Sequence, residues 1–567
     1  MQDIDPSERF RALIDAAASI LGDGVDHPNV WAVLCEHVTL EHGPAFIAFV
    51  EAILPLQDDL RIIKALRLIH AVSFGVAVDE QSGIAKLGEL EGSWPNCTEI
   101  AGAKFFLRNL SNPDRPPNLI GKFCEAPFTK FETLIDGSVA PCCSIWTKKR
   151  LGQLADGGLE ACWNSQSAQE MRASILDGSF RYCNKERCTL IMEDALPDAD
   201  EVTDPGLRNV IGKSLVILDE RPRWLFLGHD LTCNLACPSC RDQTLGLDKS
   251  FEKPLQKIEE QVIHPILHSE NKVKLSVSGQ GDPWSSPHYR SILKYIANRE
   301  LNIDLDIHTN GLLMTESRWS EYSGLEKYRP LVNISIDSCT PWVYEILRRP
   351  GKWATLHQNL IFIASRRAAG AVSEMHLNAT VQADNYHELP DMVAFAAQLG
   401  ADTIRFYMIQ NTGGHLAASY PEKNIGNPNH PLHLAFLETL RHPILGGSIA
   451  HLYDVANWRE NALQASLPSD RLGREYSQSD LLQALGETIR TGAFATTVAL
   501  CAAGRIRFPS DIGILRAEAD ALSALGFDRL SAYRQREIDA VTTKGAPEPV
   551  IPISSGSDLS DARRANA

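Results

Sequence analysis

Apolar residues recur every three or four positions over much of the first 75 residues, the spacing that gathers them on one face of a helix. The segments with this pattern are Phe10–Leu21, Val30–Val38, Pro44–Leu54 and Leu60–Val72. A polar, proline-rich run at 111–118 follows and is typical of a linker. We therefore predict a helical N-terminal region over residues 1–118.

Between residues 220 and 425 the pattern changes to short apolar strands that alternate with helical segments. The candidate strands are Trp224–Gly228, Val273–Ser278, Ile303–His308, Val332–Asp337, Met375–Gln382 and Thr403–Ile409. The first is apolar throughout, as expected of a strand buried on both faces. Helical patterns lie between them, for example Leu255–Leu267 and Leu389–Leu399. Six such β-α units predict an α/β fold whose parallel sheet curves into a partial (β/α)6 barrel.

Smaller regions flank this predicted barrel. Residues 119–200 are cysteine-rich and predict a small α+β domain, in which Phe131–Ile135 and Ser138–Ala140 form a hairpin around Asp136-Gly137. In the same region we predict that Gly158–Ile175 is helical. Residues 430–542 return to helical patterns, and the Pro-, Ser- and Ala-rich tail at 543–567 is predicted to be disordered.

Composition narrows the class of protein. The chain has 567 residues, of which 44% are hydrophobic and 22% charged, which are ordinary values for a globular protein. The net charge of −16 disfavours binding to a phosphate backbone, so we expect no nucleic-acid partner. No uncharged apolar run reaches the ~20 residues of a membrane-spanning helix, and the first residues are polar rather than signal-like. We therefore expect a cytoplasmic protein with no membrane partner.

The thirteen cysteines carry most of the chemical information. One group comprises Cys124, Cys142, Cys143, Cys162, Cys183 and Cys188, and a second comprises Cys233, Cys237 and Cys240. Without an export signal, clustered thiols indicate metal or redox chemistry rather than disulfides.

The second group has the spacing C-x3-C-x2-C and follows the first predicted barrel strand. Three thiolates on a short loop can each bind one iron of a cubane cluster and leave the fourth iron open. A zinc site is the alternative, although zinc usually has a fourth protein ligand nearby. The position after a strand favours a functional loop, because barrel proteins place their sites at the carboxyl ends of the strands.

This cysteine triplet at the start of a six-unit β/α barrel resembles the radical SAM (S-adenosylmethionine) superfamily. The resemblance implies a [4Fe-4S] cluster held by Cys233, Cys237 and Cys240, with SAM bound to the open iron. It also implies that an electron from the cluster cleaves SAM to a 5′-deoxyadenosyl radical, which takes a hydrogen atom from the substrate. A small electron-transfer protein such as a flavodoxin or ferredoxin is then the expected electron donor.

Further segments resemble the SAM-binding motifs of the same family in order. Gly279, Gly281 and Asp282 stand where the family has its Gly-Gly-Glu-Pro loop, which implies that Asp282 binds the SAM ammonium group. Asn310 belongs to a Thr-Asn-Gly segment that follows the third strand and implies a further SAM contact.

The fourth strand ends in a Ser-x-Asp motif formed by Ser335 and Asp337. In the family this motif precedes a helix whose arginine binds the SAM carboxylate. Arg348 or Arg349 would be that arginine, and the sequence leaves the choice open.

The first cysteine group has a spacing that a hairpin would fold together. Four thiolates from the hairpin and a later loop suffice for a closed iron–sulfur cluster or for a structural zinc, and spacing alone does not decide. The pattern C-x12-G-x4-C, with Pro127, Trp163-Asn164, Arg172 and a final C-x4-C, resembles a SPASM or Twitch domain. That resemblance implies one auxiliary [4Fe-4S] cluster, although such domains usually follow the barrel rather than precede it.

The implied ligands of the auxiliary cluster are Cys124, Cys142, Cys183 and Cys188, with Cys143 as an alternative to Cys142. We expect Cys162 to be part of a helix core because its helical neighbours are apolar.

The resemblance implies an enzyme that modifies a peptide or protein by crosslinking, epimerisation or oxidation. One alternative is a radical SAM dehydrogenase or epimerase of a sugar or other small molecule. An alternative of another class is a zinc-bearing interaction protein with a degenerate barrel. Cys339, just after the fourth strand, is a candidate catalytic residue that would return a hydrogen atom to a substrate radical; filling space in a loop is its alternative role.

Overall fold

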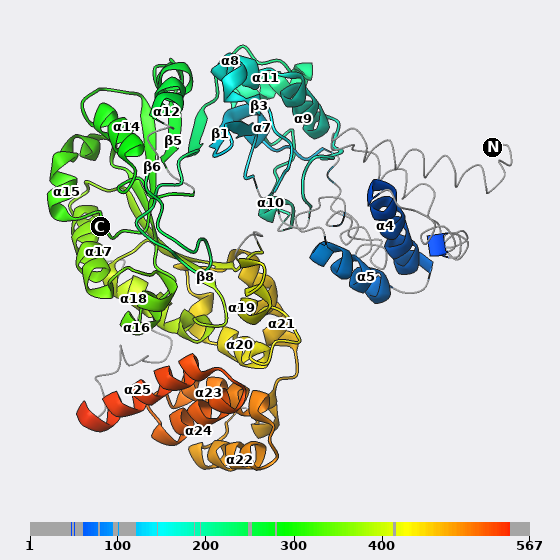
Figure 1. Ribbon diagram of the computed structural model, residues 1–567, viewed down its shortest axis with the longest axis vertical. Coiled ribbons are helices and arrows are strands. Elements are labelled where there is room, and N and C mark those ends of the chain that lie inside the picture. The colour runs from blue at the N-terminus through cyan, green and yellow to red at the C-terminus, as the bar shows by residue number, and fades with distance from the viewer. Residues whose placement is uncertain are drawn as a thin grey trace. The chain divides into compact units, whose positions relative to one another are not determined.

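The computed structural model (Figure 1) describes residues 47, 50–51, 60–77, 80–93, 100, 119, 121–144, 146–185, 188–192, 194–247, 252–277, 280–411, 416–473 and 475–544. The chain divides into two compact units, Met1–Leu231 with Leu247–Asp306 and Thr232–Gly246 with Ile307–Ala567. The helices predicted at Phe10–Leu21 and Val30–Val38 and the tail from 545 lie outside the described residues. The one predicted at Pro44–Leu54 is described at three positions only.

The first unit begins with two packed helices, α4 (Leu60–Ala77) and α5 (Glu80–Ser93). Leu66, Ile69 and Val72 of α4 are buried and lie three residues apart, which is the periodicity that predicted this helix. The helix predicted at Leu60–Val72 is therefore confirmed, and it continues for five more residues.

The predicted hairpin is present as β1 (Lys130–Leu134) and β2 (Ser138–Ala140), which pair antiparallel. Its turn is held by the Asp136 carboxylate, which accepts hydrogen bonds from the Ser138 amide at 3.0 Å and the Ser138 hydroxyl at 2.6 Å. Gly137 has a φ of +76°, a conformation that glycine adopts at no steric cost.

The segment Gly158–Ile175 is helical, as predicted, but it is broken at residues 164–165. The chain forms two helices there, α8 (Gly158–Trp163) and α9 (Gln166–Leu176). Ser165 caps the start of α9 by accepting a hydrogen bond from the Ala168 amide at 3.1 Å. Asn164 leaves the helical path and exchanges two hydrogen bonds with the backbone of Leu218.

The strands of the first unit extend this hairpin into a larger sheet. β4 (Trp224–Gly228) pairs parallel with β1 on one side and with β5 (Val273–Val277) on the other, and the unit has the order β6-β5-β4-β1-β2-β3. Its other elements are α7 (Ala126–Thr129), β3 (Gly152–Gln153), η2 (Leu154–Asp156), α10 (Thr189–Met192), α11 (Pro205–Lys213), α12 (Glu252–Ile258), η4 (Glu259–Ile263), α13 (His264–Leu267) and α14 (Pro287–Ala297).

β6 (Ile303–Thr309) runs across the boundary into the second unit, where the strand order is β10-β9-β8-β7-β6. β7 (Leu331–Ser335), β8 (Glu374–Val381), β9 (Thr403–Met408) and β10 (Ala450–His451) pair parallel in turn. The elements between and after them are α15 (Glu316–Glu321), η5 (Ser323–Tyr328), α16 (Pro341–Leu347), α17 (Trp353–Ala368), η6 (Tyr386–Glu388), α18 (Leu389–Leu399), α19 (Tyr420–Lys423), α20 (His433–Leu440), η8 (Pro443–Gly446), η9 (Tyr453–Val455), α21 (Ala456–Gln464) and η10 (Pro468–Leu472).

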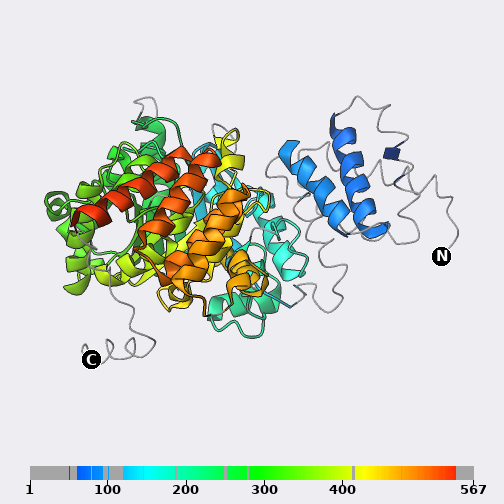
Figure 2. The same cartoon turned by 90° about the horizontal axis from the view of Figure 1, so that it is seen from below.

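Four C-terminal helices complete the second unit: α22 (Gln478–Arg490), α23 (Phe494–Arg507), α24 (Ile512–Ala524) and α25 (Asp528–Lys544). They pack against one another in sequence and lie side by side in both ribbon views (Figures 1 and 2). Cys501 is fully buried in their core, between Leu481 and Ile514, as expected of a packing thiol.

All six strands predicted from the pattern are present, with ends that differ by at most two residues. The predicted helix Leu389–Leu399 coincides with α18. The α/β class and the helical C-terminal region are thereby confirmed, whereas closure of the sheet into a partial barrel stays a prediction.

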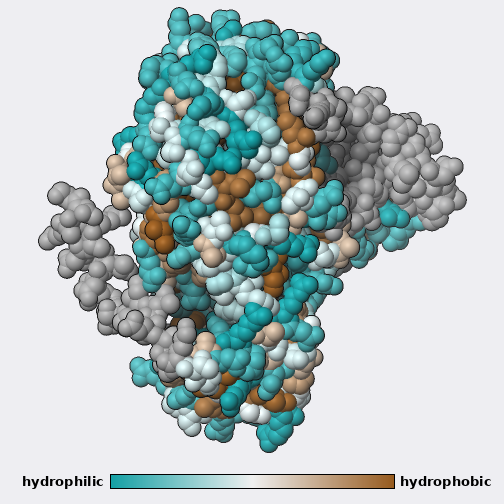
Figure 3. All heavy atoms as spheres, turned by 60° about the vertical axis from the view of Figure 1, so that its left-hand side comes forward, coloured by the Kyte–Doolittle hydropathy of each residue, from teal (hydrophilic) through white to brown (hydrophobic). Residues whose placement is uncertain are grey.

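The surface is polar with separate apolar patches. Figure 3 shows brown residues in small groups among teal ones, and exposed apolar side chains such as Ile217 and Ile361 are distant in the sequence. Within the ranges that the structure describes, no helix is long and apolar enough to cross a bilayer.

Candidate iron–sulfur and SAM sites

The hairpin and a later loop bring the first cysteine group together within the first unit. Cys142 follows β2 closely, and the segment after it is tied to the segment that carries Cys183. The Asn184 amide donates to the carbonyl of Trp146 at 2.7 Å, and the Thr147 hydroxyl donates to the carbonyl of Tyr182 at 2.8 Å.

The electrostatics of these thiols show that they converge. Burial raises the pKa of Cys124 to about 12 and raises the pKa values of Cys142 and Cys183 well above the ordinary value. The charges of other cysteines in the group raise these pKa values further. Cys124 and Cys183 raise the pKa of Cys142, Cys124 and Cys188 raise that of Cys183, and Cys188 raises that of Cys124. Four thiolates this close need positive charge between them, and the irons of a [4Fe-4S] cluster would supply it.

Two further cysteines of the region occupy different surroundings. Cys143 is half-buried and raises the pKa values of Cys142 and Cys188, so it stays a possible replacement for Cys142. Cys162 is fully buried on α8, beside Gly152, as expected of helix core. In the described part of the chain all cysteines are free thiols, and no three His, Cys, Asp or Glu side chains are grouped tightly enough to hold a single metal ion.

Arg172 connects several segments of this region through hydrogen bonds. Its side chain is fully buried on α9 and donates hydrogen bonds to four oxygens: the carbonyls of Pro127 (2.9 Å), Trp163 (2.8 Å) and Val216 (2.8 Å) and the side chain of Asn164 (2.9 Å). These oxygens belong to three separate segments, among them the one that follows Cys124. The motif residues predicted from sequence therefore form one buried hydrogen-bond network.

The second cysteine group lies in a loop of the second unit that closes on itself. Cys233 and Leu245 exchange two backbone hydrogen bonds, of 2.8 and 3.0 Å, and the Cys240 amide donates to the carbonyl of Cys237. Cys237 is buried, Cys233 is half-buried and Cys240 is exposed. The Arg241 guanidinium lies beside Cys240, with Nε 3.4 Å from its Sγ.

Asn310 touches this loop at its first cysteine. The Asn310 amide donates to the side chain of Asn234 at 2.9 Å and lies 3.9 Å from Cys233 Sγ. Gly311 next to it has a φ of +77°, and a Cβ there would lie 2.8 Å from Leu356. The Asn-Gly pair thus has a structural reason: only glycine fits the turn that directs Asn310 to Cys233.

Arg348 touches the loop at its second cysteine. Its Nη1 lies 3.9 Å from Cys237 Sγ, and its Nε forms an ion pair with Asp337 Oδ2 at 2.7 Å. Asp337 raises the pKa of the Arg348 guanidinium, which in turn opposes the rise that burial causes in the pKa of Cys237. Three thiols with the Arg348 cation beside Cys237 fit a cluster that carries negative charge.

Arg349 contacts the backbone of the cysteine loop rather than a cysteine side chain. Its Nε donates to the carbonyl of Ala236 at 3.2 Å, and the Ala236 amide donates back to the carbonyl of Arg349 at 2.7 Å. Arg349 therefore fixes the backbone of the cysteine loop, whereas the Arg348 guanidinium faces Cys237.

The predicted ammonium-binding segment lies in the first unit. Gly279 is outside the described residues, Gly281 is half-buried, and Asp282 is fully buried. Asp282 Oδ1 accepts hydrogen bonds from the backbone amides of Trp284 at 3.0 Å and Ser285 at 3.2 Å. The carboxylate thus caps its own turn, and its binding of SAM stays a prediction.

Ser335 ends β7 half-buried, and Cys339 follows four residues later, also half-buried. Burial raises the pKa of the Cys339 thiol well above its ordinary value, and Glu388 and Asp391 raise it further. Sequence reasoning missed Asn234, which positions Asn310, and Glu388, which accepts a hydrogen bond from Ser338 next to Cys339. The spacing of the motifs contains no signal for either contact.

The residues that converge in the first unit define an iron–sulfur cluster-binding region. Residues 124–189 match the model of the SPASM family, described as an iron-sulfur cluster-binding domain. The chain thus carries a SPASM domain, as predicted, and all four expected auxiliary ligands lie within the matched residues.

No curated protein matches the sequence. Among solved structures, Streptococcus suis SuiB matches with 18% identity and a TM-score of 0.27, over 37% of this chain and 44% of that one. SuiB bound to the precursor peptide SuiA matches with 15% identity and a TM-score of 0.27, over 44% of this chain and 54% of that one. The chain thus spans about half the length of these structures.

Proposed function

We propose that this protein is a radical SAM enzyme in which Cys233, Cys237 and Cys240 hold a SAM-binding [4Fe-4S] cluster. The observation that carries the proposal is the environment of the cysteine loop: Asn310 lies at Cys233, and the Asp337-paired Arg348 lies at Cys237. When bound, the cluster would supply the electron that cleaves SAM to a 5′-deoxyadenosyl radical.

The chain's own residues would bind and orient SAM. Asn310 and Arg348 present hydrogen-bond donors beside the cysteine loop, where SAM would coordinate the open iron. Ser335 and Asp337 lie at the end of β7 and just beyond it, and Asp337 keeps the Arg348 guanidinium in place. Asp282 would accept from the ammonium group, because a carboxylate forms strong charge-assisted hydrogen bonds with a cation, and Gly281 would allow the backbone to approach SAM closely.

The SPASM domain would hold one auxiliary [4Fe-4S] cluster on Cys124, Cys142, Cys183 and Cys188. We propose that this cluster accepts the electron left after hydrogen abstraction, and that a flavodoxin or ferredoxin reduces the SAM-binding cluster. The proposed substrate is a peptide or protein, because domains of this kind accompany enzymes that modify peptides. We assign residues 119–200 to the auxiliary domain and 220–425 to the SAM-binding barrel.

Iron content tests the assignment of the ligands. Protein reconstituted without oxygen should contain about eight irons per chain, four for each cluster. Replacing Cys233, Cys237 and Cys240 by alanine should leave about four, and replacing Cys124, Cys142, Cys183 and Cys188 should also leave about four. A chain that takes up zinc in stoichiometric amount and no iron would contradict the proposal.

A further inference from the structure

The loop after β7 holds Asp337 in a conformation that depends on its neighbours. Asp337 has a φ of +56°, a left-handed conformation that few non-glycine residues adopt. Its carbonyl accepts a hydrogen bond from Asn385 Nδ2 at 2.7 Å, and its Oδ1 accepts one from the Thr380 amide at 2.8 Å. The remaining oxygen, Oδ2, is the one that pairs with Arg348.

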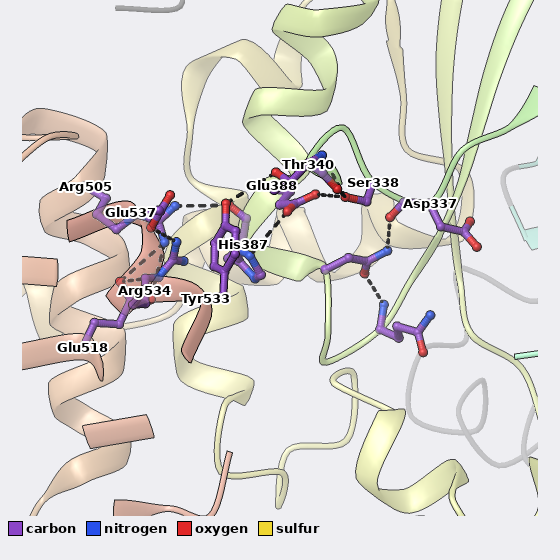
Figure 4. A network of polar contacts seen from close by, with 12 residues as sticks. Asp337, Ser338, Thr340, His387, Glu388, Arg505, Glu518, Tyr533, Arg534 and Glu537 are labelled. Atoms are coloured by element: carbon purple, nitrogen blue, oxygen red, sulfur yellow. Dashed lines mark hydrogen bonds and ion pairs between the residues drawn. The ribbon is translucent and has the colours of Figure 1, made fainter. Parts of the chain in front are cut away.

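The buried carboxyl group of Glu388 lies beside the next three residues of this loop. Glu388, the last residue of η6, is fully buried, and its Oε2 accepts a hydrogen bond from the Ser338 hydroxyl at 2.5 Å. The Thr340 side chain and the backbone amide of Cys339 lie close enough to oppose the rise that burial causes in the pKa of Glu388. Figure 4 shows Glu388 beside Ser338 and Thr340. Removal of the carboxyl group would leave the Ser338 hydroxyl without this acceptor.

Tyr533 reaches the same loop from the C-terminal helix α25. Its hydroxyl lies 3.4 Å from Thr340 Oγ1, and its ring stacks on Trp342 with an interplanar angle of 10°. The ring also contacts His387, with centroids 5.0 Å apart. A single side chain of α25 therefore touches the loop, the start of α16 and η6.

Ion pairs behind Tyr533 fix the position of α25. Arg534 binds Glu518 of α24 at 3.0 Å and Glu537 of its own helix at 2.6 Å. Arg505 of α23 binds Glu518 at 3.4 Å and donates to the carbonyl of His387 at 3.5 Å. Arg534 and Glu518 are almost fully buried, so loss of either partner would leave a buried charge uncompensated. Figure 4 shows Arg505, Glu518, Arg534 and Glu537 on the side of Tyr533 away from the loop.

We propose that Tyr533 and Glu388 are positioning residues for SAM binding, which hold the 337–340 loop so that Asp337 keeps Arg348 directed at Cys237. The C-terminal helices are then part of the SAM site's support, since their buried ion pairs set where Tyr533 stands. This inference rests on the proposed function.

The test uses the reconstituted full-length protein and four variants. Tyr533→Phe removes the hydroxyl and keeps the ring, Glu388→Ala removes the acceptor of the loop, and Glu388→Gln keeps one carbonyl oxygen. Tyr476→Phe is the matched control, because Tyr476 donates a hydrogen bond to the carbonyl of Ala503 in the same helical region and, among the described residues, forms no hydrogen bond with the 337–340 loop. The readouts are the KM for SAM in 5′-deoxyadenosine formation and the electron paramagnetic resonance spectrum of the reduced protein with SAM.

Tyr533→Phe should raise the KM for SAM about 3- to 10-fold with kcat changed less than about twofold, which is the range that one lost hydrogen bond gives. Glu388→Ala should raise it more than about 10-fold, and Glu388→Gln should restore it to within about threefold of the parent. The spectrum of the SAM-bound state should broaden in Tyr533→Phe and Glu388→Ala only. If both variants match Tyr476→Phe in KM and in spectrum, the positioning role is wrong.

Hydrogen exchange separates this proposal from the proposed function. In the protein without added SAM, amides of residues 336–341 should exchange faster in Tyr533→Phe than in Tyr476→Phe. Equal exchange would overturn the positioning role whether or not the parent cleaves SAM. Failure of the parent to cleave SAM, with faster exchange in Tyr533→Phe, would overturn the proposed function instead. Should Glu388→Ala not fold, Tyr533→Phe alone decides.

Discussion

Replacement of Arg172 by methionine should destabilise the SPASM domain more than any surface change in it. The variant loses four hydrogen bonds from a fully buried guanidinium, three of them to backbone carbonyls of separate segments. At about 0.5–1.5 kcal/mol for each bond, the loss is about 4 kcal/mol in the local free energy of unfolding. Methionine fills a similar space, so lost packing adds little.

Native-state hydrogen exchange is the assay, because a chain of several units has no single free energy of unfolding. A loss of about 4 kcal/mol corresponds to exchange about 1,000-fold faster for the protected amides of α9 and of the segment around Leu218. Arg181→Met is the control, since Arg181 pairs with Asp177 near the surface at 2.6 Å and should change exchange less than about tenfold. If the two variants exchange alike, Arg172 does not hold these segments together.

Three further outcomes are expected. Asp282→Asn keeps an oxygen for the turn at Trp284 and removes the charge, so it should weaken SAM binding, measured by equilibrium dialysis, by about 1.5–3 kcal/mol with iron content unchanged; unchanged affinity would show that this loop does not bind the ammonium group. Burial raises the pKa of Glu388 to about 8, above its ordinary value in the unfolded chain, so stability due to this group is full below about pH 4.5 and is lost as the pH rises through 8; the melting temperature of Glu388→Gln should fall less over that range, and parallel curves would contradict a buried neutral acid. Cys339→Ala should keep both clusters and SAM cleavage but should end the incorporation of solvent deuterium into the product. If the variant makes normal product at a normal rate, Cys339 has only a packing role.

The strand and helix pattern could be predicted because burial dictates it locally. Trp224–Gly228 and Leu389–Leu399 were predicted to the residue, since each is bounded by a change in apolar pattern that a single element explains. The break between α8 and α9 could not be predicted, because Asn164 leaves the helix for partners at Leu218, 54 residues away.

The candidate cysteine ligands and the motif around Arg172 could be predicted from their resemblance to known motifs, because their residue types are rare and their chemistry is narrow. The support around them was not. Asn234, Glu388 and Tyr533 act through hydrogen bonds between segments far apart in the chain, the last of them over 193 residues to Thr340. Ordinary polar residues in such contacts leave no periodic or compositional signal.

Reductive cleavage of SAM tests the central claim most directly. The reconstituted protein, reduced with dithionite and supplied with SAM, should form 5′-deoxyadenosine and methionine. The variant in which Cys233, Cys237 and Cys240 are all alanine should form none while it retains about four irons in the SPASM domain. Formation of 5′-deoxyadenosine at the parent rate by that variant, or none by a parent that contains about eight irons, would contradict the account.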